Sequence, residues 1–177
     1  EIIDKYGADS LRFSLLSGTT MGNDIRFMRE KVEQASNFAN KIWNAAKFVI
    51  NNSANEEKVR EFCYNAFEKN KKYDPKYFKL EDKWILNKFD KLVVEVSKNI
   101  DNYDLGIALD KIYTFLWNEF CDWYIEMVKP RIYSDDEEIK IPVTDVLNHI
   151  LASSLKLLHP FMPFISEEIY KDLITFG

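Results

Sequence analysis

Glycine is scarce in this chain, with only 5 residues among 177. An average protein contains about 7% glycine. Gly-rich phosphate-binding loops, tight hairpins and bladed sheets all depend on glycine, because it alone adopts their backbone conformations freely. We therefore expect neither a nucleotide-binding loop nor an all-β architecture.

Cysteine is scarcer still, and the two residues present, Cys63 and Cys121, cannot form a metal site alone. This usage suits a reducing compartment, so we expect a cytoplasmic protein. Runs of about 18 apolar residues are missing, as is a visible signal peptide, so we expect no membrane partner. The net charge of −5 argues mildly against a nucleic-acid partner, because such domains usually carry a basic field.

Hydrophobic residues make up 46% of the chain and aromatic residues 15%, so it is not a disordered tail. Its length fits one domain that needs neither a disulfide nor a metal to hold its core. Because the sequence begins with Glu1 rather than methionine, we expect a piece of a longer protein.

Apolar residues recur at spacings of three and four, the pattern of amphipathic helices. The pattern predicts helices over residues 8–17, 29–51, 81–99, 105–128, 142–158 and 166–173, and more weakly over 56–69. We expect Pro130 to end the helix that begins at 105, before an acidic loop at 135–138, and Ser166 to cap the last helix. The fold prediction is all-α, an antiparallel bundle of four to five main helices.

A polar stripe on the helix at 29–51 is the first candidate site. It consists of Asn37, Asn40, Lys41, Asn44 and Lys47. Asparagine is a mediocre helix former, and its carboxamide offers both donors and acceptors, as reading unstacked base edges requires. Lysines at the same face suit phosphates. Packing of this face on another helix is the equal alternative.

Phe38 is expected at the edge of the polar stripe, where its ring could stack on a base. Trp117 and Trp123 are expected to pack under neighbouring helices, with a ligand site as the alternative. Lys129 and Arg131 follow a helix, and we favour an interaction with its dipole over RNA contact. The lysines between 69 and 79 are expected to form a solvated basic loop.

Catalytic motifs are missing from the chain, which contains no CxxC, HExxH, GxGxxG or P-loop pattern. His149 and His159 have structural interpretations, as a helix-face histidine and as a residue at a helix end. Neither is paired in sequence with a serine or cysteine in a supporting context. We therefore expect no catalytic residue, metal or cofactor in this chain.

Four segments, taken in order, resemble one enzyme family. YGADSLRF at 6–13 is similar to the segment after the KMSKS loop of class I aminoacyl-tRNA synthetases. GNDIRF with NFANKIWNAAKFV at 22–27 and 37–49, WNEFCDWYIE at 117–126 and LHPFMPFISEE at 158–168 resemble valyl-tRNA synthetases in particular. Isoleucyl, leucyl and methionyl relatives match less well. A helical protein-interaction bundle and an isoleucyl-type anticodon domain stay open as different interpretations of the same chain.

The resemblance implies that residues 1–27 end a stem-contact region after the catalytic domain and that 28–177 form the helical anticodon-binding domain. ATP, magnesium and the catalytic step would belong to the missing parts, so this chain alone would bind valine tRNA as a monomer without catalysis. Arg12 would support the link to the missing catalytic domain or contact the inner corner of the tRNA. Net charge would not exclude this role, because it describes only the long-range field.

The resemblance also implies a set of RNA-binding residues on the helix at 29–51. The family often has arginine immediately before the Asn-Phe pair, where this chain has Ser36. Arg29 or Lys41 could substitute for it. The implied RNA-binding residues are Asn37, Phe38, Asn40, Lys41, Asn44 and Arg29.

Overall fold

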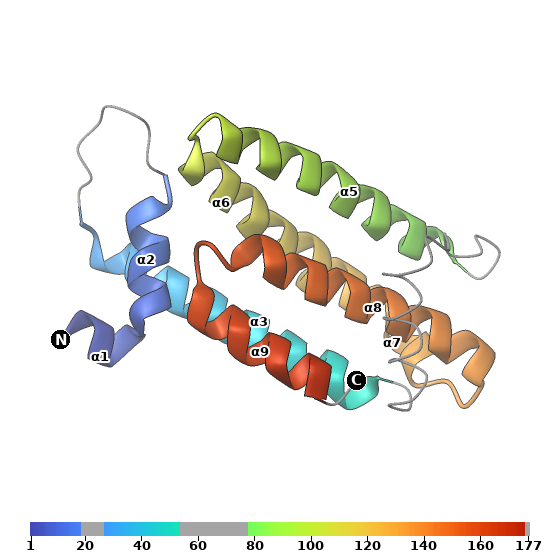
Figure 1. Ribbon diagram of the computed structural model, residues 1–177. Coiled ribbons are helices and arrows are strands. Elements are labelled where there is room, and N and C mark those ends of the chain that lie inside the picture. Colours follow the sequence, from blue (N-terminus) through green and yellow to red (C-terminus); the bar gives the residue numbers. More distant parts are fainter. Residues whose placement is uncertain (19–26, 54–77, 176–177) are drawn as a thin grey trace.

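A computed structural model describes residues 1–18, 27–53 and 78–175, and every regular element in these ranges is helical (Figure 1). The elements are α1 Ile2–Tyr6, α2 Ala8–Leu16, α3 Arg29–Asn52, α5 Leu80–Asp101, α6 Leu105–Thr114, the π-helix η2 Phe115–Tyr124, α7 Ile125–Ile132, α8 Glu137–Leu158 and α9 Pro163–Thr175. The all-α prediction is confirmed. The weak helix expected at 56–69 lies outside the described residues, as does most of the basic loop at 69–79.

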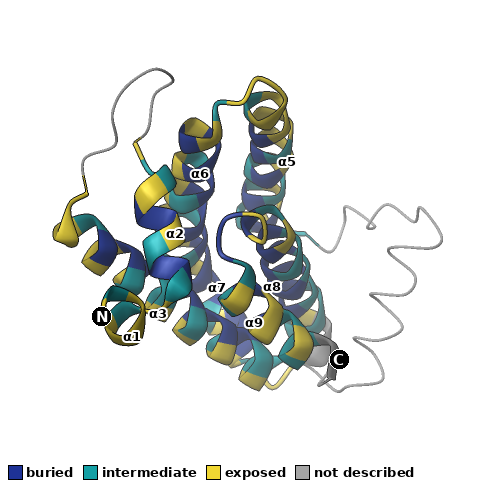
Figure 2. Cartoon of the chain, turned by 60° about the vertical axis from the view of Figure 1, so that its left-hand side comes forward, coloured by how far each residue is buried: buried dark blue, intermediate teal, exposed yellow. Residues whose placement is uncertain are grey.

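Consecutive helices are joined by short turns at 102–104, 133–136 and 159–162, so α5 and α6, α7 and α8, and α8 and α9 run antiparallel (Figure 1). Their buried sides face one another in Figure 2, with the exposed residues on the outer sides. The shared core takes at least one apolar residue from every helix between α2 and α9 that the structure describes. Phe13 of α2 belongs to this same core, which ties the N-terminal residues to the bundle.

The helix expected at 105–128 is longer and less regular than predicted, because α6, η2 and α7 follow one another without a break to Ile132. Pro130 therefore lies in the last turn of α7 instead of ending the helix before it. The 10 residues of η2 have the wider π-helical turn, which changes the face each later residue occupies. As a result Met127 is 42% exposed, whereas Ile125 and Val128 are buried.

Two helix starts were predicted too late. Helix α8 begins at Glu137, so Pro142 lies inside it, and the expected acidic loop is partly helical. Helix α9 begins at Pro163, which suits the first helical position because proline needs no N–H partner there. Ser166 therefore lies within α9 and does not cap it, contrary to the expectation.

The turn before α9 is held by side chains of α2. Arg12 donates hydrogen bonds to the backbone oxygens of Pro160, at 3.0 Å, and of Phe161, at 3.3 Å. Asp9 accepts bonds from the backbone N–H groups of Phe164, at 3.3 Å, and Ile165, at 2.7 Å. In this structure Arg12 thus stabilises the bundle itself.

A buried ion pair joins the start of α5 to the end of α7. Two nitrogens of the Arg131 guanidinium bond to Asp82, whose carboxylate is 0% exposed, and Glu81 lies 3.2 Å from the same guanidinium. The Tyr124 hydroxyl donates to Asp82 Oδ1 at 2.7 Å. Burial and the adjacent carboxylate raise the pKa of Tyr124. Arg131 lies in the last turn of α7, as the expected interaction with the helix dipole requires, but its direct partner is a buried carboxylate on another helix.

Candidate nucleic-acid interface

A row of carboxamides follows the solvent-exposed side of α3. Asn37, Asn40 and Asn44 are all exposed, while Ala35, Ile42 and other apolar residues of α3 are buried. None of these three carboxamides makes a side-chain hydrogen bond to another residue of the described ranges. The alternative expectation, that this face packs on another helix through its amides, is not met in this part of the chain. The stripe presents free donors and acceptors to solvent.

Two exposed cations lie on either side of the row of carboxamides. Arg29 is exposed at the first position of α3, about 12 Å before Asn37 at the helical rise of 1.5 Å per residue. Lys47 is exposed beyond Asn44, with its ammonium 5.4 Å from the centroid of the Trp43 ring. Both positions can reach a backbone phosphate of a ligand that lies along the stripe.

Phe38 does not lie at the edge of the stripe, because its side chain is 0% exposed. Its ring packs 5.4 Å from Phe13, 4.8 Å from Tyr113 and 6.3 Å from Trp117, measured between ring centroids. These partners come from α2, α6 and η2, which cover the side of α3 that faces inward. The expectation that Phe38 stacks on a base is therefore wrong for this structure, since neither face of the ring is free.

Lys41 lies beside the carboxamides and already has partners within the protein. Its Nζ donates to Asp122 Oδ1 over 2.6 Å and lies 3.9 Å from the centroid of the Trp117 ring. Both partners belong to η2. Lys41 thus lies beside the carboxamides, but its charge is balanced within the protein.

The two tryptophans of η2 have different surroundings. Trp117 is partly buried and stacks on Tyr113, at 5.6 Å between ring centroids, as expected for a residue packed under a neighbouring helix. Trp123 is 62% exposed, so the same expectation is wrong for it. The wider turn of η2 accounts for the difference, because it carries Trp123 away from the core.

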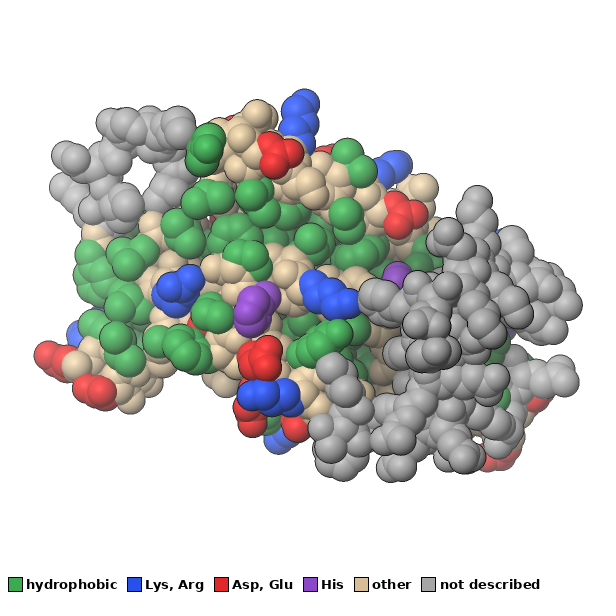
Figure 3. All heavy atoms as spheres, viewed as in Figure 1, with side chains coloured by type: hydrophobic (Ala, Val, Ile, Leu, Met, Phe, Trp, Pro, Cys, Tyr) green, Lys and Arg blue, Asp and Glu red, His purple; other side chains and the backbone are tan. Residues whose placement is uncertain are grey.

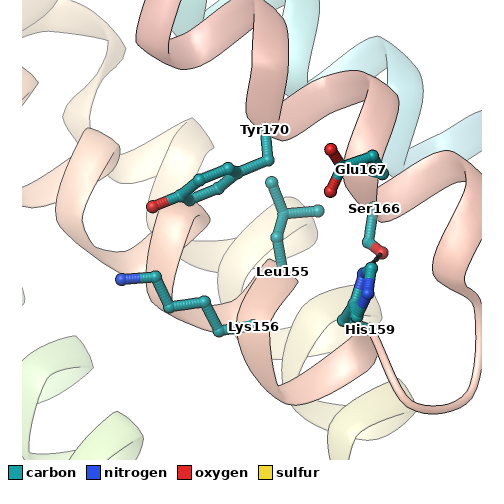
Figure 4. A pocket seen from close by; sticks show the side chains of 6 residues that line it. All are labelled: Leu155, Lys156, His159, Ser166, Glu167 and Tyr170. Carbon is teal, nitrogen blue, oxygen red and sulfur yellow. Dashed lines mark hydrogen bonds between the residues drawn. The ribbon is translucent and has the colours of Figure 1, made fainter.

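A shallow pocket of about 270 Å³ between α8 and α9 contains a histidine–serine contact (Figure 4). His159 Nδ1 lies 2.9 Å from Ser166 Oγ, a pairing that the sequence did not predict. Ser166 is 1% exposed and donates its own proton to the Pro163 carbonyl. A buried hydroxyl used in this way is no nucleophile, so the pair closes the turn before α9.

The face that carries this pocket is largely apolar. In Figure 3 hydrophobic side chains gather over α2, α5 and α8, with isolated charged groups among them, and α3 lies behind α9 in this view. His149 of α8 faces Phe89 of α5 at 6.3 Å between ring centroids, and burial lowers its pKa. This is the structural role expected for His149.

Among the described residues there is neither a cluster of metal-binding side chains nor a membrane-spanning helix. No group of three or more His, Cys, Asp or Glu side chains in these ranges is arranged to hold a metal ion. No helix of the described part is long and apolar enough to cross a membrane.

The sequence profile described as "Anticodon-binding domain of tRNA ligase" matches residues 82–176, more than half of the chain. The chain belongs to this family of anticodon-binding domains. The profile covers the helices from α5 to α9, whereas α3 precedes the matched residues.

Longer matches include α3. The chain is 51% identical over 173 residues to a valine–tRNA ligase of Clostridium tetani, and 52% identical over 175 residues to that of Clostridium perfringens. These alignments cover 98% and 99% of the chain but only 18% and 19% of the relatives, so the chain spans about a fifth of their length.

The fold resembles that of a solved synthetase. A methionyl-tRNA synthetase of Mycobacterium tuberculosis, in its apo form, superposes with a TM-score of 0.66. The match covers 95% of this chain and 33% of that protein, at 20% sequence identity. At this identity the likeness shows the fold alone.

Sequence reasoning found the carboxamides but missed Asp122 as the partner of Lys41. The two residues are 81 positions apart, and no local pattern links them. One signal was present: Lys41 and Asp122 both lie in the segments that resemble valyl-tRNA synthetases.

Proposed function

We propose that this chain is the anticodon-binding region of a valine–tRNA ligase and that it binds valine tRNA. The support is identity of about half of all positions to two such ligases, across nearly the whole chain. Residues 1–27 would then end the stem-contact region that follows the catalytic domain. Valine activation with ATP and magnesium, and any contact with the catalytic domain, would belong to the longer protein. We further propose that it works as a monomer in the cytoplasm.

The α3 stripe is the proposed surface for the anticodon. The observation that carries this assignment is the exposure of Asn37, Asn40 and Asn44 without side-chain partners among the described residues. Carboxamides can donate and accept at once, so they can distinguish the edges of unstacked bases. Exposed Arg29 and Lys47 would bind phosphates on either side. The proposed surface does not include Phe38, because its side chain is 0% exposed.

Binding of two RNAs tests the proposal. The chain is titrated, with fluorescence anisotropy as the readout, against a valine tRNA transcript and against the same transcript with a scrambled anticodon. We expect tighter binding of the native anticodon and an affinity that falls with salt, because phosphate contacts release counterions. Replacing Asn37 and Asn44 together by alanine should bring the two affinities close to each other.

The matched control is Asn87→Ala, which removes an exposed carboxamide from α5 instead of α3. This variant should retain the preference for the native anticodon. Equal binding of both transcripts by the unaltered chain would contradict recognition of the anticodon. Unchanged tRNA binding by the double variant would favour a protein-interaction bundle, the alternative role of this helical architecture.

A further inference from the structure

Lys41 and Asp122 form an ion pair beside the carboxamides of α3. The ammonium of Lys41 lies 2.6 Å from Asp122 Oδ1 and 3.9 Å from the centroid of Trp117. The side chain of Lys41 is 24% exposed, whereas that of Asp122 is 50% exposed. The carboxylate is therefore the more accessible of the two charges, and a ligand approaching Lys41 meets it first.

The charged groups of this ion pair are one cation, Lys41, and one anion, Asp122. Burial raises the pKa of the neighbouring Cys121 thiol to about 12, so that group is neutral at physiological pH. Burial, and secondarily the charge of Asp122, also raise the pKa of Tyr113. Asp122 thus cancels the charge of Lys41 at this point of the surface.

The bond to Asp122 also fixes the position of the Lys41 ammonium. Lys41 is four residues after Asn37 and three before Asn44, so all three side chains are neighbours on α3. An ammonium carries three donors, and the bond to Asp122 uses one of them. The remaining donors can serve an uncharged acceptor beside the carboxamides. A phosphate at the same place is repelled by the carboxylate.

We propose that Asp122 is a specificity-determining positioning residue of the RNA face. It holds Lys41 as a directed donor for a base edge and keeps the RNA backbone away from that position. Discrimination between RNAs therefore depends on contacts with the bases, and the binding of unrelated RNA is suppressed. This inference rests on the proposed anticodon function and adds a residue of η2, outside α3, to that surface.

The test compares Asp122→Asn with the unaltered chain, using the two valine tRNA transcripts over a range of salt concentrations. Asparagine keeps the size of the side chain but releases the charge of Lys41. We expect several-fold tighter binding of the scrambled transcript and a smaller preference for the native anticodon. The salt dependence should steepen by about 0.7 in the log–log slope, the value for one added single-strand phosphate contact.

Glu95→Gln provides the matched control. Glu95 pairs with Lys111 at the same 2.6 Å and is 54% exposed, but it lies on the α5–α6 side of the molecule. The substitution removes the same charge as Asp122→Asn, but away from α3. It should therefore leave the preference for the native anticodon and the salt slope unchanged. Thermal melting checks that each variant is folded, and Asp122→Ser replaces Asp122→Asn if the latter is unfolded.

A double variant distinguishes positioning from general repulsion. With Lys41→Gln already present, the Asp122 substitution should no longer reduce the preference, because there is no ammonium to position. An Asp122 variant that is folded and keeps both the preference and the slope overturns the inference. Equal changes in Glu95→Gln also overturn it. If the unaltered chain shows no preference at all, the proposed function itself fails, and the inference fails with it.

Discussion

Asp9 of α2 accepts a 2.7 Å hydrogen bond from the Ile165 backbone N–H of α9, across 156 positions of sequence. The same carboxylate accepts from the Phe164 N–H at 3.3 Å. These are two of the N–H groups that have no partner within a helix at its start. Asp9 thus caps the N-terminus of α9 from a different helix, whereas a capping residue normally precedes the helix it caps. Its negative charge is also favourable near the positive, N-terminal end of the α9 dipole.

Replacing Asp9 by alanine should therefore weaken the whole bundle. We expect the free energy of unfolding to fall by about 1–2 kcal/mol, the usual cost of removing a cap. Asp9→Asn keeps an acceptor and should cost less. Urea denaturation followed by circular dichroism measures both. Asp4→Ala, at a side chain that is 86% exposed, should change stability by no more than about 0.5 kcal/mol. Equal losses in Asp9→Ala and Asp4→Ala would contradict a capping role.

The burial of Phe38 gives a prediction that separates packing from RNA stacking. Phe38→Ala should lower the free energy of unfolding by about 3–5 kcal/mol, because it leaves a cavity between α2, α3, α6 and η2. Phe38→Leu should cost less, since it fills more of the space.

Binding of tRNA by folded Phe38→Leu is the decisive measurement. If Phe38 is only a core residue, the folded Phe38→Leu variant should bind tRNA with nearly unchanged affinity. A ring that stacked on a base would instead contribute about 1–3 kcal/mol to binding, which leucine would lose. A large loss of affinity with little loss of stability would therefore show that Phe38 leaves the core to meet RNA.

The sequence predicts some features of this surface and not others, for physical reasons. The helical periodicity of α3 is local, so it correctly predicts the exposed side that carries Asn37 and Asn44. Phe38 lies three residues after Ala35 and four before Ile42, so the same periodicity favours its buried side; what the local pattern does not show is that rings from α2, α6 and η2 cover it completely. An α-helical wheel assumes a constant turn, so the ten π-helical residues of η2 displaced Trp123 from its predicted packing. Long-range pairs such as Asp9 with α9 leave no local signal.

The buried pair of Asp82 and Arg131 should be costly to break from one side. Asp82→Ala leaves a buried guanidinium without its main partner and also removes the acceptor of the Tyr124 hydroxyl. We expect a loss of about 3–5 kcal/mol in the free energy of unfolding, because an unpaired buried charge is left behind. Chemical denaturation measures this loss.

Two comparisons show whether the loss comes from the unpaired charge. Replacing Asp82 by leucine and Arg131 by methionine together should recover much of the stability, because no buried charge remains. Glu126→Ala breaks the exposed pair with Lys129 and should cost less than about 1 kcal/mol. A double variant as unstable as Asp82→Ala would indicate that lost packing, and not the charge, is responsible.

Asp145 of α8 should make stability depend on pH in the direction opposite to most carboxylates. Burial raises the pKa of this group to about 7, from an ordinary value of 3.8. Between these two values the folded state binds more protons than the unfolded state, so stability falls as pH rises. Asp145→Asn should therefore stabilise the protein by about 1–3 kcal/mol at pH 8 and have little effect near pH 4. Denaturation at both values tests this, with exposed Asp135→Asn as the control. An equal effect of Asp145→Asn at the two pH values would contradict a raised pKa of this half-buried carboxyl, because the cost of ionising it inside the folded protein arises only at the higher pH.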